Sequence, residues 1–244
     1  MELYLLPTEQ LISGLFSLFF AIISIIVGVK LILKYFRYKQ RTFLLVGLTW
    51  IGMVSMWYPS AINVIYFTIT GSSIPDLLFM LIGNGLIPIT SFIWMIAFTD
   101  LLYKEKQKII LIVFGILSAL FEIFYLYFLF IDPSVLGEVL SPVDATWRLP
   151  ITLYQASTLV MILITGTLIG RGSLKSSDPE VRLKGKFLFA AIYSFILGGI
   201  FEIFSDLSII ILITGRLILV SASIEFYLGW ILPDWMKKRL LKES

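Results

Sequence analysis

Apolar residues in this chain fall into seven long runs separated by short polar stretches. A helix needs about 20 residues to cross a hydrocarbon core of about 30 Å, and the runs are close to or above that length. They predict seven membrane-spanning helices, at residues 9–33, 43–69, 77–100, 109–130, 150–170, 187–205 and 208–232.

Two features refine this pattern. Pro59 lies inside the second run, and a proline there removes a backbone hydrogen bond and clashes with the preceding turn, so we expect a kink. Only a few residues around Ser205 join the sixth and seventh runs, which predicts antiparallel neighbours. The stretches 131–149 and 171–186 are rich in turn-forming residues, and we expect both to be surface connections.

Composition supports the bilayer as the solvent of this chain. Hydrophobic residues make up 59% of it and charged residues only 14%, whereas a soluble domain carries about 25% charged residues. The fold class predicted is therefore all-α, a polytopic integral membrane bundle that forms one domain over residues 1–244. We expect a multi-pass protein of the cell membrane, with the lipid bilayer as its first partner.

The distribution of charge predicts an orientation. Of the 19 basic residues, 16 follow predicted helices 1, 3, 5 and 7, and the opposite loops carry mainly acids. The positive-inside rule then places the N-terminus outside and the C-terminus in the cytoplasm. Because the basic residues stand in short clusters between apolar runs, nucleic acid is not an expected partner. The oligomeric state is left open.

The absence of two residue types narrows the chemistry. The chain has no cysteine and no histidine, which excludes disulfides, thiolate or imidazole metal sites and any catalysis that uses these side chains. The seventh predicted helix also lacks the lysine that a retinal Schiff base requires. We expect no enzyme activity, no metal and no cofactor.

Charged residues inside a membrane are costly and mark candidate sites. Arg216 lies about 12 Å from the outer end of the seventh predicted helix, and Glu202 and Asp206 lie within reach of it. Glu122 occupies the fourth predicted helix, and Phe-Glu-Ile-Phe occurs around both glutamates, at 121–124 and 201–204. Two interpretations stay open for the Glu202–Arg216 region. It is either a structural ion pair or part of an outward-opening pocket or switch.

Further polar side chains are expected at the same outer depth: Asn63, Asn84, Gln155 and Tyr154. Apolar walls with a few polar groups are typical of a ligand pocket, although such residues also join helices in pairs. After the last helix, four residues suit a membrane interface with anionic lipid: Trp235, Lys237, Lys238 and Arg239.

The last third of the chain resembles a known group. Asp178-Pro-Glu-Val-Arg182, Gly198-Gly199, Gly215-Arg216-Leu217 and the stretch from Phe226 to Trp235 carry the resemblance. Together they resemble uncharacterised archaeal seven-helix membrane proteins, which are similar to the seven-helix sensor module that precedes some histidine kinases. The resemblance implies that a signalling domain would attach after Pro233. The sequence ends at Ser244, so we expect output through a separate cytoplasmic partner.

These observations predict a stand-alone membrane sensor or receptor-like module. A small ligand, a lipid or the state of the membrane would act on it through the polar pocket. Two alternatives remain: a small-solute or proton-coupled transporter, and a scaffold or complex subunit without a ligand.

Overall fold

The computed structural model describes residues 4–241, apart from the side chain of Asp206. Within this range, seven helical spans are long and apolar enough to cross a membrane, which confirms the number of spans expected from the pattern. The spans are Thr8–Tyr38, Arg41–Thr70, Asp76–Leu102, Lys104–Ile131, Leu149–Leu174, Pro179–Ile203 and Ile209–Trp230.

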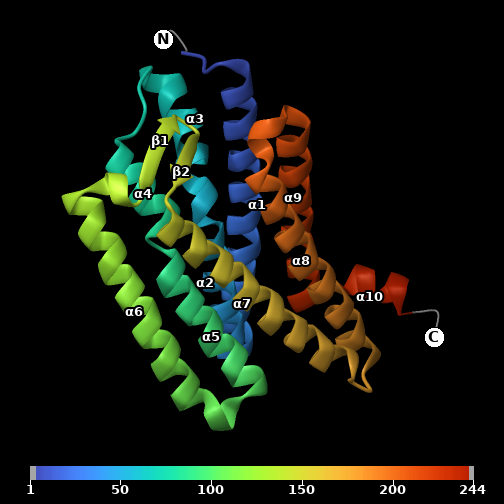
Figure 1. The fold of residues 1–244 in the computed structure, drawn as a ribbon. Helices are drawn as coiled ribbons and strands as arrows, with labels where there is room; N and C mark the ends of the chain where they lie inside the picture. The colour runs from blue at the N-terminus through green and yellow to red at the C-terminus, as the bar shows by residue number, and fades with distance from the viewer. Residues whose placement is uncertain (1–3, 242–244) are drawn as a thin grey trace.

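Five of the spans contain one long helix each. These are α1 (Thr8–Tyr38), α6 (Gln107–Ile131), α7 (Leu149–Leu174), α8 (Pro179–Ile203) and α9 (Ile209–Trp230). A short helix, α10 (Asp234–Leu240), follows and projects to the side of the bundle (Figure 1).

The second and third spans are interrupted. A 3-10 turn at Val54–Trp57 separates α2 (Arg41–Met53) from α3 (Tyr58–Thr70), with Pro59 in the first turn of α3. This break is the expected kink, because proline needs no hydrogen-bond acceptor at the start of a helix. The third span breaks between α4 (Asp76–Asn84) and α5 (Ile87–Leu102), again with a proline, Pro88, in the first turn of the new helix.

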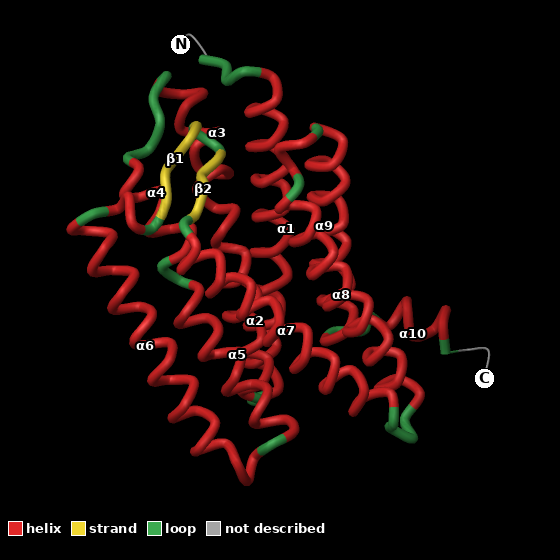
Figure 2. Tube along the Cα trace, in the orientation of Figure 1, coloured by secondary structure: helices red, strands yellow, loops and turns green. Residues whose placement is uncertain are grey.

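One expected loop is a sheet. Residues 137–147 form an antiparallel hairpin of β1 (Gly137–Ser141) and β2 (Asp144–Trp147), drawn in yellow in Figure 2. We call the end of the bundle that carries this hairpin the hairpin end. The opposite end, where Lys39, Lys104 and Lys175 lie at the turns between helices, is the basic end (Figure 1).

The other expected loop, 171–186, is mostly helical. α7 continues to Leu174 and α8 begins at Pro179, so only four residues join them. Asp178 caps α8 by accepting a hydrogen bond from the backbone N–H of Glu180 at 2.8 Å. An aspartate before a proline is a typical helix start, which explains why the connection is shorter than predicted.

The helices pack around an aromatic core. Trp50 of α2 stacks on Phe226 of α9 with ring centroids 4.0 Å apart, and Phe195 of α8 lies against Trp50. α8 and α9 form the most extensive helix pair, as their short connection predicts. α6 lies at the edge of the bundle, and only 6% of its apolar 18-residue stretch is buried (Figure 1).

Candidate functional site

A cavity of about 710 Å³ lies at the hairpin end of the bundle. The hairpin and every described helical span except α6 contribute to its wall. This volume lies within the range of about 300–1,000 Å³ that is typical of small-molecule pockets. The breaks at Pro59 and at Leu86 help to form the cavity, because they bend the second and third spans beside it.

Aromatic and sulfur-containing side chains form much of the wall. Trp57 and Phe195 line the cavity from the second span and from α8, and Phe79 and Trp147 line it from α4 and the hairpin. Beyond Phe195, the stacked pair of Trp50 and Phe226 closes the space toward the basic end. The cavity is therefore a chamber that opens at the hairpin end.

Arg216 is the most buried charged group in this wall, with only 3% of its surface exposed. Its Nη2 donates a hydrogen bond to Glu202 Oε1 at 2.5 Å, and its Nη1 donates one to Ser17 Oγ at 2.5 Å. The guanidinium also lies 5.9 Å from the ring centroid of Trp57. A charge inside a membrane protein persists only when it is paired, and these contacts provide the pairing.

The predicted partnership between Glu202 and Arg216 is confirmed by this geometry. It joins α8 to α9 at the floor of the cavity, where Glu202 remains 29% exposed. The Asp206 side chain lies outside what the structure describes, so its expected approach to Arg216 stays a prediction.

Ser17 is a partner that the sequence reasoning missed. The hydroxyls of Ser24 and Ser223 lie 2.9 Å apart one level further along the same two helices, α1 and α9. On α1, Ser24 follows Ser17 by seven residues, and on α9, Ser223 follows Arg216 by seven residues. The two contacts therefore lie on facing stripes of these helices. Ser13 also lies on that stripe. This row of serines along a mostly apolar helix is the sequence signal by which the polar face of α1 could have been found.

Asn84 and Gln155 are hydrogen-bonded to each other. Gln155 Nε2 of α7 donates a hydrogen bond to Asn84 Oδ1 of α4 at 2.8 Å, and both residues line the cavity. Asn84 is 3% exposed, and its Nδ2 has no hydrogen-bond partner within residues 4–241. This amide pair and the Glu202–Arg216 pair are two places where polar side chains from different helices meet in the wall.

Asn63 does not line the cavity. Its Nδ2 donates to the backbone oxygen of Pro142 at 2.6 Å, and its Oδ1 accepts from the N–H of Ile74 at 2.8 Å. Ser60 donates to the oxygen of Val143 at 2.7 Å. The bonds to Pro142 and Val143 hold the turn of the hairpin against α3, so Asn63 supports the cavity wall without lining it. Its spacing in the sequence does not reveal this, because the partners are backbone atoms of a distant loop.

Tyr154 and Glu122 also lie outside the cavity wall. Tyr154 of α7 stacks on Phe121 of α6, with centroids 3.6 Å apart. Glu122 lies on α6, which packs mainly against α5, and the described partners of Arg216 do not include it. The two Phe-Glu-Ile-Phe boxes thus have different surroundings, because Glu122 of α6 lies outside the cavity wall and Glu202 of α8 lines it.

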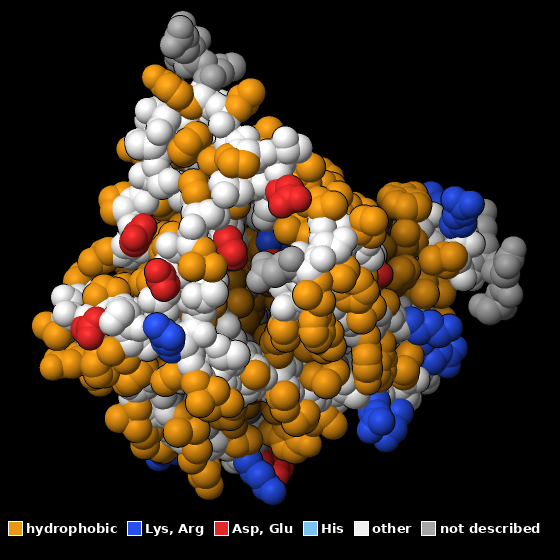
Figure 3. Space-filling view, turned by 45° about the horizontal axis from the view of Figure 1, so that its top comes forward, with side chains coloured by type: hydrophobic (Ala, Val, Ile, Leu, Met, Phe, Trp, Pro, Cys, Tyr) orange, Lys and Arg blue, Asp and Glu red, His pale blue; other side chains and the backbone are white. Residues whose placement is uncertain are grey.

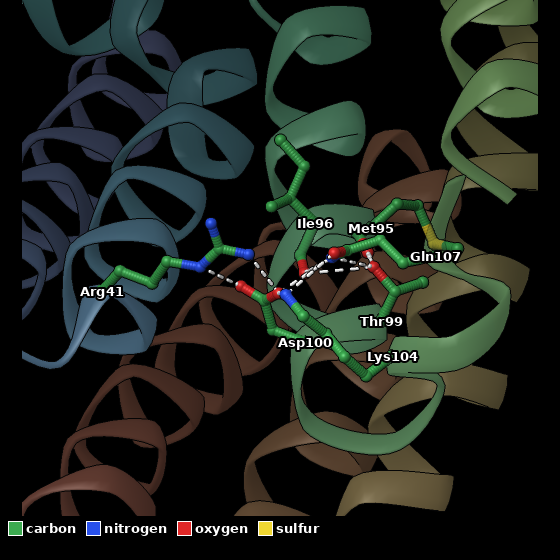
Figure 4. A network of polar contacts seen from close by, with 7 residues as sticks. All are labelled: Arg41, Met95, Ile96, Thr99, Asp100, Lys104 and Gln107. Atoms are coloured by element: carbon green, nitrogen blue, oxygen red, sulfur yellow. Dashed lines mark hydrogen bonds and ion pairs between the residues drawn. The ribbon is translucent and has the colours of Figure 1, made fainter. Parts of the chain in front are cut away.

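A second polar network ties the helices at the basic end. Asp100 of α5 accepts hydrogen bonds from Arg41, from Lys104 Nζ at 2.7 Å and from Gln107 Nε2 at 2.8 Å (Figure 4). Gln107 Nε2 also donates to Thr99 Oγ1 at 2.9 Å. Arg41 and Lys104 are mostly exposed, so this network joins α2, α5 and α6 at the surface of the bundle.

The C-terminal helix is tied to the start of α8. Lys237 Nζ lies 2.8 Å from Glu180 Oε2, and Glu180 also pairs with Lys184. The hydrogen bond with Glu180 raises the pKa of Lys237 above its ordinary value. Trp235 is 62% exposed, which suits the expected anchoring at a membrane interface. Lys238 and Arg239 lie in the last turn of the same helix.

No protein-family model matches this chain, and a search of curated proteins finds no match. The resemblance to sensor modules of histidine kinases, and with it an archaeal source, therefore stays a prediction.

Proposed function

We propose that this protein is a membrane sensor or receptor-like module that binds a small molecule in the cavity at its hairpin end. One observation carries the proposal. The buried Arg216–Glu202 pair, which joins α8 to α9, also lies in the wall of a ligand-sized chamber. A purely structural ion pair needs no such chamber beside it, whereas a receptor needs both volume and oriented polar groups.

The proposed orientation places the hairpin end outside the cell. Basic residues follow α1, α5, α7 and α9 in the sequence and lie at the basic end, which would face the cytoplasm under the positive-inside rule. The cavity would then open to the outside, and α10 would lie at the cytoplasmic surface of the cell membrane. A cytoplasmic signalling partner would meet this surface.

α8 provides the proposed route between the two ends. It carries Glu202 at the cavity and Glu180 at the basic end, 22 residues or about 33 Å away. A ligand that competes for Glu202 would weaken its bond to Arg216 and so change the packing of α8 on α9. A rigid helix transmits such a shift, provided that the ligand binds one arrangement more tightly than the other.

Paired spin labels test this coupling. The chain has no cysteine, so Ser177→Cys and Lys106→Cys place two labels at exposed positions of the basic end without background labelling. We expect Glu202→Gln to change the distance distribution between the labels in liposomes. Glu122→Gln is the matched control, because Glu122 lies on α6 outside the cavity wall, and it should leave the distribution unchanged.

Three outcomes contradict the receptor proposal. Identical distance distributions in the wild type and Glu202→Gln would show that the pair does not communicate with the basic end. Solute or proton flux in the same liposomes that is lost in Glu202→Gln would identify a transporter instead. Loss of stability without either effect would leave the pair as structural support of a scaffold.

A further inference from the structure

The charge of the cavity wall is acidic. Among its described lining residues, the charged side chains are those of Glu9, Asp144, Glu202 and Arg216, a net charge of −2. The single base is already bound to Glu202 at 2.5 Å and is 4% exposed. Figure 3 turns the hairpin end forward and shows acidic side chains spread around a hollow on this face. The described wall carries more acids than bases, which favours a cationic occupant over an anionic one.

The apolar part of the wall suits the same kind of ligand. Trp57, Phe79, Trp147 and Phe195 line the chamber, and Met53 lies beside them. Aromatic rings carry negative charge on their faces, and cages of such rings bind ammonium groups that are too bulky to be well hydrated. Among the described residues, no three Asp or Glu side chains lie close enough together to hold a metal ion, so we do not assign a metal cation to this wall.

Asn84 adds a requirement for an acceptor. It is 97% buried and lines the chamber, and its Nδ2 lacks a hydrogen-bond partner among the described residues. A buried amide N–H without a partner is costly, so an occupant with an oxygen acceptor would be favoured at this place. The Gln155 side chain holds Asn84 from the other side through Oδ1.

From these three observations we propose that the ligand is a small organic cation, a quaternary or substituted ammonium compound that also carries an oxygen acceptor. The inference rests on the proposed receptor function and specifies its ligand class. The ammonium group would lie among the aromatic rings near Glu202, and the acceptor would face Asn84. An anion of the same size would meet the negative charge of Glu202 beside Arg216.

Three isosteric probes test the charge requirement on the full chain in maltoside micelles, which contain no ammonium group. They are choline, neohexyl alcohol, in which carbon replaces the nitrogen of choline, and the anion tert-butylacetate. Saturation-transfer NMR measures binding of each. We expect choline to bind at least about tenfold more tightly than the alcohol, and the anion to bind most weakly. Equal binding of choline and the alcohol, or no saturable binding of choline, would overturn the inference.

Matched variants locate the effect. Glu9→Gln with Asp144→Asn removes two acids from the wall, and we expect it to reduce the preference for choline over the alcohol several-fold. Asp132→Asn with Glu138→Gln removes two acids of the same end that do not line the cavity, and it should leave the preference intact. If both double variants behave alike, the preference does not come from the cavity.

Two further measurements complete the test. One distinguishes a lipid headgroup from a free solute as the source of the cation, and the other distinguishes failure of the receptor function from failure of the ligand class. Short-chain phosphatidylcholine that outcompetes choline would identify a lipid headgroup as the source, whereas weaker competition would indicate a free solute. Choline that binds without changing the distance between labels at Ser177 and Lys106 would contradict the receptor function and leave the cation site standing. A response to Glu202→Gln without any preference for choline would contradict the ligand class alone.

Discussion

Arg216 of α9 donates a hydrogen bond to Ser17 of α1 at 2.5 Å, while the same guanidinium holds Glu202 of α8. Three helices therefore meet at one buried cation. Ser24 and Ser223 repeat the contact between α1 and α9 seven residues further along. Displacement of Glu202 from Arg216 would thus affect the packing of α1 as well as that of α8 and α9.

Loss of one partner of the ion pair should be far more harmful than loss of both. Arg216→Met leaves the Glu202 carboxylate without its partner, and breaking a buried pair in this way costs about 3–5 kcal/mol. The double variant Arg216→Met with Glu202→Gln leaves no uncompensated charge, so it should be more stable than Arg216→Met alone. Thermal unfolding in detergent measures both, and additive losses would contradict the pairing. Asp234→Asn, at a side chain that is 91% exposed, is the control and should change little.

The two serine contacts should differ in their energetic weight. Ser17→Ala removes an acceptor from a buried guanidinium, and leaving a buried polar group unsatisfied costs about 1–3 kcal/mol. Ser24→Ala removes only a bond between two neutral hydroxyls, and such interhelical bonds average about 0.6 kcal/mol in membranes. Unfolding of the two variants under identical conditions checks the order. A larger loss for Ser24→Ala would show that Ser17 does not support the cation.

Close approach of α1 and α2 depends on two glycines. A Cβ at Gly28 would lie 2.9 Å from the backbone oxygen of Gly47, and one at Gly47 would lie 2.7 Å from that of Gly28. Gly28→Val should therefore separate the helices and destabilise the bundle by about 1–3 kcal/mol or more. Gly199→Ala is the matched control, because its nearest neighbour is a leucine methyl at 3.6 Å. Similar melting temperatures for both variants would contradict this packing.

Docking of α10 should depend on pH through Lys237. Its pKa is raised by Glu180 above the ordinary value of 10.5, so the bond contributes stability below pH 10.5 and loses it as the pH rises through the raised value. A nitroxide at Leu240→Cys should become more mobile at that pH. Lys237→Gln should already show the mobile spectrum at neutral pH, whereas Lys238→Gln should resemble the wild type. A spectrum that is unchanged in Lys237→Gln would show that α10 is held by other contacts.

Much of the architecture follows from local properties. The number of spans, the break before Pro59 and the pairing of α8 with α9 depend on run length, proline chemistry and a short connection. The 137–147 hairpin was not predicted, because its strands are short and its turn is held by Ser60 and Asn63 from a distant helix. Within the candidate site, the pairing of Glu202 with Arg216 was predictable because intramembrane charges need partners, whereas a shared depth did not distinguish Asn84 and Gln155 from Asn63.

The sequence by itself determined the membrane class, the seven spans and the identity of the buried cation, since these depend on composition and periodicity along one chain. Only the tertiary structure decided which polar residues share a chamber. Asn63 and Glu122 have the same depth and chemistry as Asn84 and Glu202, yet they lie outside the cavity wall. Depth along a helix is a local coordinate, whereas the direction a side chain faces depends on how each helix rotates and bends against its neighbours.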